Sequence, residues 1–296
     1  MGGILDSAEL QAASYTYRAL FKERLAELPQ LYKKLATIIE NPDSAATKLD
    51  WLADISEMKE WLGDRQIEKL RAFDYSITHK DWENTIQVHK RDLKRDRVGI
   101  VKPRINAMAE SYIDHLQGMV NTLVTGMFST ACYDGQYLID TDHPLEDGST
   151  QSNKLTAALS DSSFKDAIEV MASLKTYKGL TVHQTLSGLL LLIGPSNMAT
   201  AHKIVGNKGA GQALTGYEGM AEPVVCPVLV GSHATKWALV RPRFGLMPFI
   251  ISREQDVESA QDLLFMRPYY LFGVDSSDNA GYGLYEVIVG STGEGV

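Results

Sequence analysis

The sequence predicts an α+β protein in which thin appendages are attached to a compact α/β unit. Three observations lead to this fold class. Apolar residues recur at spacings of three and four over 105–128, apolar and polar residues alternate over 70–89, and short helical and strand patterns follow one another from Ser160 onward. Appendages that cannot bury their own apolar side chains indicate a protein that assembles with other chains.

The helical pattern over 105–128 is the clearest element of the chain. Its apolar residues follow the helical spacing without interruption, and Pro103 stands where the start of a helix tolerates proline. At ~1.5 Å per residue, this single helix is about 36 Å long. We expect Leu116 and Leu123 on its buried stripe, and we interpret its methionines as core residues rather than as a cofactor site.

Residues 4–40 are predicted to form an amphipathic helical arm, which Pro29 breaks or kinks and which 41–44 end. The spacing of Leu28, Leu31, Leu35 and Ile38 extends the helical pattern to the end of this arm. Two interpretations remain open with equal weight. The arm packs on another chain, or it forms a helical pair within the core of its own domain.

Residues 47–89 are predicted to form an extended antiparallel hairpin, with a chain reversal at 79–81. Strand-like alternation runs through Phe73, Tyr75 and Ile77 on one face, and a second strand follows at 85–89. An isolated hairpin is at best marginally stable in water, so this one needs a surface to lie on. We expect its large side chains to contact neighbouring subunits: Trp51, Trp61, Arg65, Phe73, Tyr75 and Trp82.

Residues 90–104 are the strongly basic stretch of the chain, with seven Lys or Arg against two Asp, whereas 253–296 carries eight acidic residues against two Arg. Two segments of opposite charge can complement each other in a self-associating protein. We therefore expect contacts between subunits at Lys90, Arg91, Lys94 and Arg95. Contact with packaged nucleic acid and a merely solvated face are the alternatives.

The chain from Ser160 onward predicts a compact α/β unit. Ser160 and Asp161 cap a helix that ends at Gly179, a second short helix covers 195–205, and Gly206–Gly219 forms a glycine-rich loop. Strands are expected at Leu189–Ile193, Val224–Val230, Trp237–Arg241, Leu246–Ile251, Leu263–Phe272 and Tyr282–Val289. Residues 275–281 are expected to connect the last two strands.

Composition limits the function classes. The 296 residues carry a net charge of −8, which does not favour tight binding of nucleic acid by the surface as a whole. The two cysteines, Cys132 and Cys226, are too few and too far apart to indicate a disulfide framework. The N-terminus lacks the apolar segment that a signal peptide requires. The longest apolar run, Leu189–Ile193, is far shorter than the roughly 20 residues of a membrane span.

No motif in the sequence predicts a catalytic, cofactor or metal site. Asp140, Asp142 and His143 are the most enzyme-like group, and they favour a polar turn in which Asp side chains cap backbone amides over a divalent-metal site. The glycines of 206–211 lack the Lys-Ser/Thr of a phosphate loop. Neither cysteine has a histidine near it in sequence, although a spatial neighbour stays possible.

Four stretches resemble one protein family. The return strand of the predicted hairpin reads FDYSITHKDWENTIQVHKRDLKRD, and the more specific stretches are FSTACYDGQYLIDTDHP, SNKLTAALSDSSFKDAIEVM and FMRPYYLFGVDSSDNAGYGLYEVIVGSTG. Over roughly 47–296 the chain resembles the major head subunit of Mu-like phages and prophages, which has the Hong Kong 97 (HK97)-like capsid fold. The resemblance assigns no chemistry to Asp140–Pro144, and it carries no cross-linking motif to this chain.

The resemblance implies four regions. They are an N-terminal helical arm at 1–46, an extended loop at 47–80, a peripheral domain with the long "spine" helix at 81–159 and 253–296, and an α/β axial domain at 160–252. Because only 46 residues precede the loop, we expect no built-in scaffold domain.

The implied function is structural rather than enzymatic, without cofactors or membrane contact. Hexamers and pentamers of the subunit would form an icosahedral phage head around double-stranded DNA, with a separate scaffolding protein and a portal as partners. Two alternatives remain. One is a cellular nanocompartment shell of the same fold, and the other is a metal-dependent enzyme that uses Asp140, Asp142 and His143.

Overall fold

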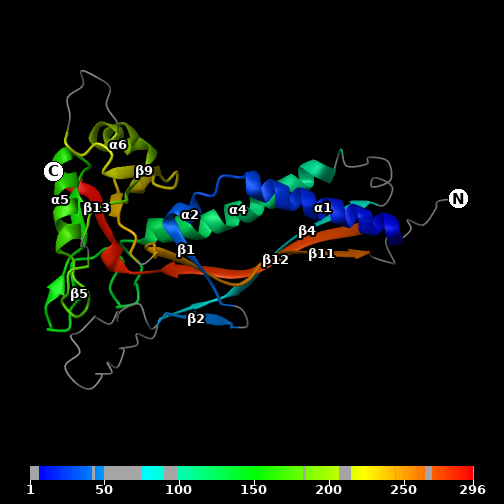
Figure 1. Ribbon diagram of the computed structural model, residues 1–296, viewed down its shortest axis with the longest axis horizontal. Helices are drawn as coiled ribbons and strands as arrows, with labels where there is room; N and C mark the ends of the chain where they lie inside the picture. The colour runs from blue at the N-terminus through cyan, green and yellow to red at the C-terminus, as the bar shows by residue number, and fades with distance from the viewer. Residues whose placement is uncertain are drawn as a thin grey trace.

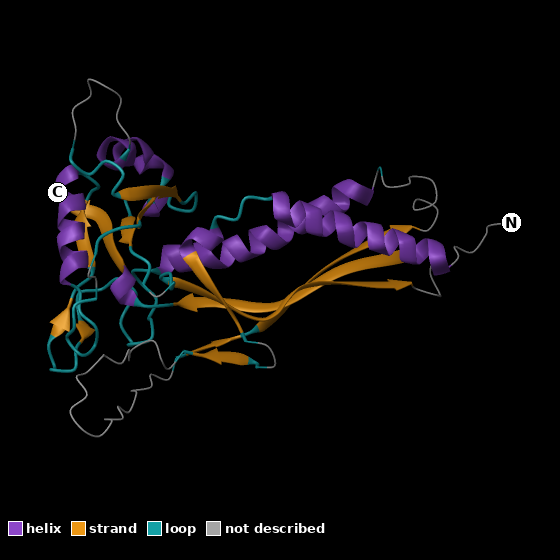
Figure 2. Cartoon of the chain, viewed as in Figure 1, coloured by secondary structure: helices purple, strands orange, loops and turns teal. Residues whose placement is uncertain are grey.

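The computed structural model describes residues 7–41, 44–49, 75–89, 99, 101–182, 185–206, 215–243, 245–263 and 269–295. Two β-sheets organise this part of the chain. A long four-stranded sheet runs beside the longest helix, and a five-stranded sheet with its own helices lies at one end of that helix (Figure 1). The helices α1 and α4 lie along the long sheet (Figure 2).

The longest helix, α4 (Val101–Gly126), confirms the predicted spine helix. It begins four residues before the predicted start, with Pro103 in its first turn, where the missing backbone N–H needs no helical partner. Leu116 is completely buried, and Leu123 packs partly buried against the same core. The buried stripe consists of Val101, Ile105, Met108, Ala109, Ile113, Leu116, Val120 and Val124.

The four-stranded sheet has the order β1-β11-β12-β4. The long strands β11 (Phe249–Leu263) and β12 (Tyr269–Tyr282) are antiparallel, and β4 (Lys80–His89) pairs along β12. Side chains of α4, α1, β12 and β4 form one apolar cluster between the helices and the sheet. The sheet therefore buries one face against the helices, and the 80–89 part of the predicted hairpin packs within its own chain rather than on a neighbouring subunit.

The predicted connection at 275–281 is wrong, because these residues lie inside β12. The segment is polar, but its side chains find partners within the sheet and on α4. Asp278 accepts from His115 (3.0 Å), and the amide of Asn279 donates to the carbonyl of Thr78 (2.7 Å). For the same reason β11 is far longer than the predicted strand at Leu246–Ile251: its second half is polar as well.

The N-terminal arm is helical only in part. Helix α1 (Ser7–Glu27) ends before Pro29 as predicted, and α2 (Tyr32–Leu35) is a single turn. Ile38, which the helical spacing included, instead lies in strand β1 (Ala36–Glu40), parallel to β11. Three consecutive β-branched residues favour the extended form once an open strand edge is present.

Of the two interpretations of the arm, packing within its own chain holds for the described side chains. Tyr17 and Phe21 are buried in the cluster with α4 and β12, and Tyr17 makes edge contacts with Tyr270 and Phe272.

The predicted hairpin is present at its base, where β2 (Ala46–Lys48) pairs with β3 (Ser76–Thr78). The predicted reversal at 79–81 is wrong, since a single residue, His79, separates β3 from β4 and both are extended. Nδ1 of His79 lies 2.6 Å from the carbonyl oxygen of Ser44 and Nε2 lies 2.6 Å from Oγ of Ser252. These bonds fix the base of the hairpin to β11. Residues 50–74, with Trp51, Trp61, Arg65 and Phe73, lie outside the described residues.

The five-stranded sheet has the order β7-β13-β10-β8-β9. Its strands are β7 (Lys154–Ala157), β13 (Ile288–Gly295), β10 (Trp237–Val240), β8 (Leu189–Ile193) and β9 (Ala221–Val225). The predictions for β8 and β10 are confirmed, while β9 begins and ends earlier than predicted. Both faces are buried: Leu191 and Leu239 join the cluster under the helices, and Leu192 and Ala238 join the cluster at the end of α4.

The helices on this sheet are α5 (Asp161–Ser173) and α6 (Met198–Val205), the latter preceded by the 3-10 turn η2 (Pro195–Asn197). Ser160 caps α5 as predicted: its Oγ accepts from the backbone of Ser163, and Oγ of Ser163 accepts from the backbone of Ser160. The helix ends at Ser173 rather than at Gly179, which lies in the following turn with φ +83°.

Strand pairing changes two of the predicted region boundaries. β13 pairs with β10 and β7, so 288–295 belongs with the five-stranded sheet and not with the predicted peripheral segment 253–296. β1 likewise belongs with the four-stranded sheet rather than with a separate arm. The chain passes from β12, in the four-stranded sheet, to β13, in the five-stranded sheet, through the 3-10 turn η4 (Tyr285–Val287).

Truncating the centre of the α4 stripe tests its burial. We expect Leu116→Ala to lower the free energy of unfolding of the unassembled subunit by about 2–5 kcal/mol, because it leaves a cavity in the core. Urea unfolding followed by circular dichroism measures this. Asp114→Ala, on the exposed side of the same helix, is the matched control and should change it by less than about 0.5 kcal/mol. Equal effects of the two variants would contradict the assigned stripe.

Candidate functional site

Two of the predicted contact residues lie in the described part of the chain, Tyr75 and Trp82. Tyr75 is half-buried and is tied to its own sheet, since its hydroxyl accepts from the backbone of Tyr282 (2.9 Å). Trp82 remains 39% exposed, with Nε1 donating to the carbonyl of Asp278 (3.1 Å) and its ring beside that of His115. Trp82 is therefore a rigidly held aromatic side chain on the surface. Lys90, Arg91, Lys94 and Arg95 lie outside the described residues.

The segment after α4 contains the second group, and it folds as a series of capped turns. Gly135, with φ +89°, allows the tight turn in which Oδ1 of Asp134 accepts from the backbone of Gln136 (3.0 Å). Asp140 accepts from the backbone N–H of Thr141 (2.9 Å) and of Tyr137 (3.3 Å). The predicted polar turn is thus confirmed for Asp140.

The alternative metal site at Asp140, Asp142 and His143 is wrong in its geometry. Asp140 is occupied by backbone amides, Asp142 is exposed, and His143, in the short strand β5 (His143–Pro144), is completely buried and points elsewhere. A strand at His143 separates it from the side chain of the preceding residue, because successive side chains of a strand point to opposite sides.

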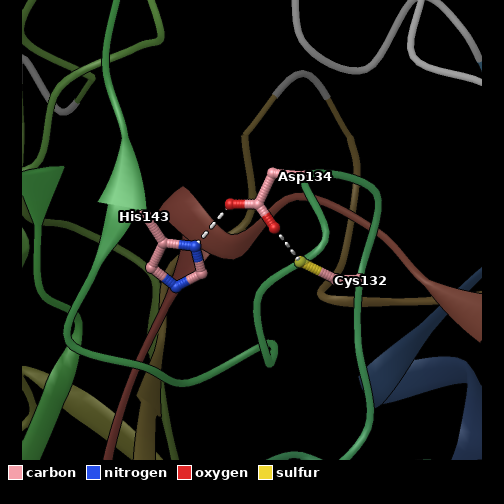
Figure 3. Close-up of side chains that lie close together, drawn as sticks. All are labelled: Cys132, Asp134 and His143. Atoms are coloured by element: carbon pink, nitrogen blue, oxygen red, sulfur yellow. Dashed lines mark hydrogen bonds and ion pairs between the residues drawn. The ribbon is translucent and has the colours of Figure 1, made fainter. Parts of the chain in front are cut away.

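His143 instead meets Asp134 and Cys132 in the interior. Nδ1 of His143 donates to Oδ2 of Asp134 (2.6 Å), and the thiol of Cys132 donates to Oδ1 of the same carboxylate (3.0 Å). Asp134 lies between the other two side chains (Figure 3). In the described part of the chain, this is the one group of three His, Cys, Asp or Glu whose ligand atoms all lie within 4.8 Å of one another.

Asn153 fixes the orientation of the histidine. Its Nδ2 donates to the carbonyls of Leu138 (2.8 Å), Tyr285 (3.2 Å) and Ile288 (3.1 Å), so its Oδ1 is the atom that faces Nε2 of His143 (3.2 Å). Both ring nitrogens of His143 therefore face acceptors, and the buried ring is held between the Asp134 carboxylate and the Asn153 amide.

Aromatic rings and a second carboxyl group complete the surroundings. The ring of Tyr285 stacks face to face on the His143 ring, with 3.7 Å between centroids. Tyr133 stacks on Tyr285 with 5.8 Å between centroids, and it hydrogen-bonds to Glu286. Burial raises the pKa of Glu286 to about 8, although the charge of Arg243 pulls it down.

The electrostatics of the group favour a structural centre over a nucleophile. Burial alone would raise the pKa of Asp134, but the hydrogen bonds from His143 and Cys132 outweigh it and hold this pKa below its ordinary value. Burial and the neighbouring Asp134 raise the pKa of the Cys132 thiol far above its usual range. A cysteine nucleophile needs a depressed pKa and a base beside the sulfur, whereas here a carboxylate stands between sulfur and imidazole.

The model of one protein family matches the first half of the sequence. The model of the family described as "Mu-like prophage major head subunit gpT" matches residues 10–161, which is half of the chain and includes α1, α4 and the whole Cys132–Asn153 segment. The chain belongs to this family. Its fold is the Hong Kong 97 type of phage capsid protein, as the resemblance implied.

Two sequence relatives support the family membership. The Mu-like prophage FluMu major head subunit of Haemophilus influenzae is 35% identical over 136 residues, covering 45% of this chain and 44% of that protein. The major capsid protein of Escherichia phage Mu is 30% identical over 142 residues, covering 48% and 46%. The matched stretch spans less than half the length of either relative.

A solved structure shows the same fold along almost the whole chain. The subunit in the procapsid of bacteriophage JBD30 superposes with a TM-score of 0.59 at 20% identity, covering 97% of this family member and 76% of that chain. The likeness extends beyond the family match, through the five-stranded sheet and the second half of the four-stranded sheet.

The sequence predicted a polar turn at His143, whereas His143 lies buried in β5, and it did not indicate the partners of this side chain. Asp134 stands nine positions before it, Asn153 ten positions after it, and Tyr285 far along the chain. A local signal existed only for Asp134, which precedes a glycine in a turn. No signal pointed to Tyr285, because it reaches His143 only when β13 joins the five-stranded sheet.

Removing the carboxylate beside His143 tests the buried contact. We expect Asp134→Asn to lower the free energy of unfolding by about 1–3 kcal/mol, because it weakens the buried hydrogen bonds that His143 and Cys132 make to the carboxylate. Urea unfolding at neutral pH measures the change. Asp142→Asn, on the exposed residue beside His143, is the control and should stay within about 0.5 kcal/mol of the unchanged chain. If both variants behaved alike, the contact between Asp134 and His143 would not be stabilising.

Glu286 predicts a pH dependence of stability. Its folded-state pKa lies above its unfolded value, so the folded chain holds a proton that the unfolded chain releases. This contribution to stability is fully present below about pH 4.5 and is lost as the pH rises to about 8, at up to about 1.4 kcal/mol per pH unit.

Glu286→Gln removes the titrating carboxyl group, so a comparison of the two proteins separates its effect on stability from that of all other groups. Urea unfolding of both proteins at pH 5, 6.5 and 8 should give a stability difference that grows with pH in favour of the glutamine variant. A difference that stays constant across the three pH values would show that Glu286 does not titrate in this range.

Proposed function

We propose that this chain is the shell-forming subunit of a phage head, which assembles into hexamers and pentamers and closes an icosahedral shell around double-stranded DNA. The observation that carries the proposal is the family match across α1, the β2–β3 base and α4, together with the capsid fold of the whole chain. A separate scaffolding protein and a portal are the further partners in this proposal. Its place is the capsid of the virion, assembled in the cytoplasm of a bacterial host.

No helix in the described part of the chain is long and apolar enough to cross a membrane.

In this proposal the loop that leaves β2 and returns at β3 lies across a neighbouring subunit. The supporting observation is its base: β2 and β3 are short, and His79 and Ser252 fasten them to β11, so the intervening residues 49–75 start from a fixed point. Its large side chains are Trp51, Trp61, Arg65, Phe73 and Tyr75, and Trp82 stands exposed on the adjoining strand.

The basic residues Lys90, Arg91, Lys94 and Arg95 are proposed to contact acidic residues of a neighbouring subunit. A suitable acidic surface exists on the long sheet, where strand register sets Glu83 opposite Asp275 and Asp275 opposite Glu258. Like charges directly opposite one another across strands are unfavourable. A basic segment of a second copy would relieve this repulsion, whereas several other acidic residues of 253–296 are already paired within the chain: Glu254, Asp256 and Asp278.

The alternative of a cellular nanocompartment shell differs in what the particle encloses. Such a shell of the same fold would hold protein cargo, while the proposed head would hold nucleic acid. The enzyme alternative loses its support with the geometry of Asp140 and Asp142 described above.

Replacing the loop tests the assembly proposal. A chain in which a short Gly-Ser linker replaces residues 50–74, with β2 and β3 retained, should keep the melting temperature of the subunit but should form no closed particles. Native mass spectrometry and negative-stain micrographs of the unchanged chain should show hexamers, pentamers and closed shells.

A second variant separates loop length from loop chemistry. It keeps every residue of the loop except Trp51, Trp61 and Phe73, which become Ser, and we expect it to assemble as poorly as the linker variant because the aromatic contact area is lost. Closed particles from the linker variant would overturn the loop assignment. An unchanged chain that stays monomeric at all salt concentrations, with and without its scaffolding protein, would overturn the shell function itself.

A further inference from the structure

Cys132, Asp134 and His143 bring a thiol sulfur, a carboxylate and an imidazole nitrogen to one buried point, and shell assembly makes no evident use of them (Figure 3). The side chain of His143 is 0% exposed and that of Asp134 is 3% exposed, while Cys132 is buried as well. Sulfur and imidazole nitrogen are ligands for zinc-like ions and not for magnesium or calcium. Cys226, the other cysteine, is buried elsewhere and belongs to no such group in the described residues.

The surroundings of His143 are those of a metal-binding histidine. Metal-bound histidines usually donate their other ring N–H to a fixed acceptor, which sets the orientation of the ring. Oδ1 of Asn153 is such an acceptor for Nε2, and three backbone carbonyls hold the Asn153 amide in place. Nδ1 is thereby directed at the Asp134 carboxylate. The stacked ring of Tyr285 holds the plane of the imidazole.

We propose that Sγ of Cys132, the Asp134 carboxylate and Nδ1 of His143 bind one divalent ion of the zinc class. In the metal-free state the thiol hydrogen of Cys132 and Nδ1 of His143 both point at the carboxylate. Binding releases the thiol proton to solvent, and Nδ1 presents its lone pair to the ion while the ring hydrogen stands on Nε2, facing Oδ1 of Asn153. The bound state then holds a thiolate, a carboxylate, a neutral imidazole and the ion, whose charges sum to zero, so no uncompensated charge is buried.

The distances require only a small adjustment. Zinc–ligand bonds of ~2.0–2.3 Å set neighbouring ligand atoms of a tetrahedral site about 3.3–3.6 Å apart. The present separations are 2.6 Å between Nδ1 and Oδ2 and 3.0 Å between Sγ and Oδ1. These two separations must therefore widen by less than about 1 Å, and all three ligand atoms already lie within 4.8 Å of one another. Asp134 lies in the turn before the exposed Gly135, so this turn supplies both the movement and the route for the ion, and a water molecule takes the fourth position.

Cobalt titration of the full chain tests the proposal. After dialysis against EDTA and then against metal-free buffer, Co²⁺ should bind at one equivalent with a thiolate-to-cobalt absorption band in the near ultraviolet. Zn²⁺ should displace it without further change in stoichiometry, and Zn²⁺ added to the metal-free chain should release the thiol proton in weakly buffered solution and raise the melting temperature of the subunit.

Two variants locate the site, and a third is the control. Cys132→Ser should abolish the absorption band, and His143→Gln should weaken binding by more than the roughly 10–100-fold that changes in outer-shell residues cause. Cys226→Ser should bind as the unchanged chain does. Less than about one-tenth of an equivalent bound to the unchanged chain, or a cobalt band that survives Cys132→Ser, would overturn the proposal. The stoichiometry is measured on the unchanged chain, so it tests the proposal even if Cys132→Ser does not fold.

Discussion

The two sheets of this protein depend on one buried polar centre where the chain crosses between them. The segment after α4 enters the five-stranded sheet past Asp134, His143 and Asn153, and the segment after β12 enters it past Tyr285. Asn153 binds the backbone of both crossings at once, and the His143 ring stacks on Tyr285. Unpaired polar groups inside a protein are costly, so these contacts permit little freedom between the two crossings.

The long sheet is divided by a second polar region, midway along α4. One apolar cluster gathers around Ile105 and Phe272 and the other around Leu116 and Phe249. Between them, His115 hydrogen-bonds to Asp278, and Arg253 pairs with Asp256 and donates to the hydroxyl of Tyr112. The register of β11 against β12 shifts on either side of Gln255, in the same region. Polar side chains and irregular register thus coincide where the apolar contact is interrupted.

The candidate metal site and the shell function both involve the 132–153 segment. The hydrogen bonds of Asp134, His143 and Asn153 join the 132–153 segment to both crossings without an ion. The ion proposed above would join the same side chains through metal–ligand bonds and would make the stability of the subunit depend on metal supply and on pH.

The sequence by itself determined the elements whose pattern is local. The apolar stripe of α4, the Ser160 cap of α5 and the buried run of β8 were each predicted, because a helix face, a capping box or a short apolar strand is specified by residues a few positions apart. Only the tertiary structure decided that Ile38 is in a strand, that Asp275–Gly281 continues β12, and that His143 faces Asp134, Asn153 and Tyr285. In each of these the deciding partner lies on a distant element: β11 supplies the edge for β1, α4 supplies His115 for Asp278, and η4 supplies the ring above His143. A polar or ambiguous segment takes the conformation in which its hydrogen bonds are completed, and those bonds do not exist until the sheets have formed.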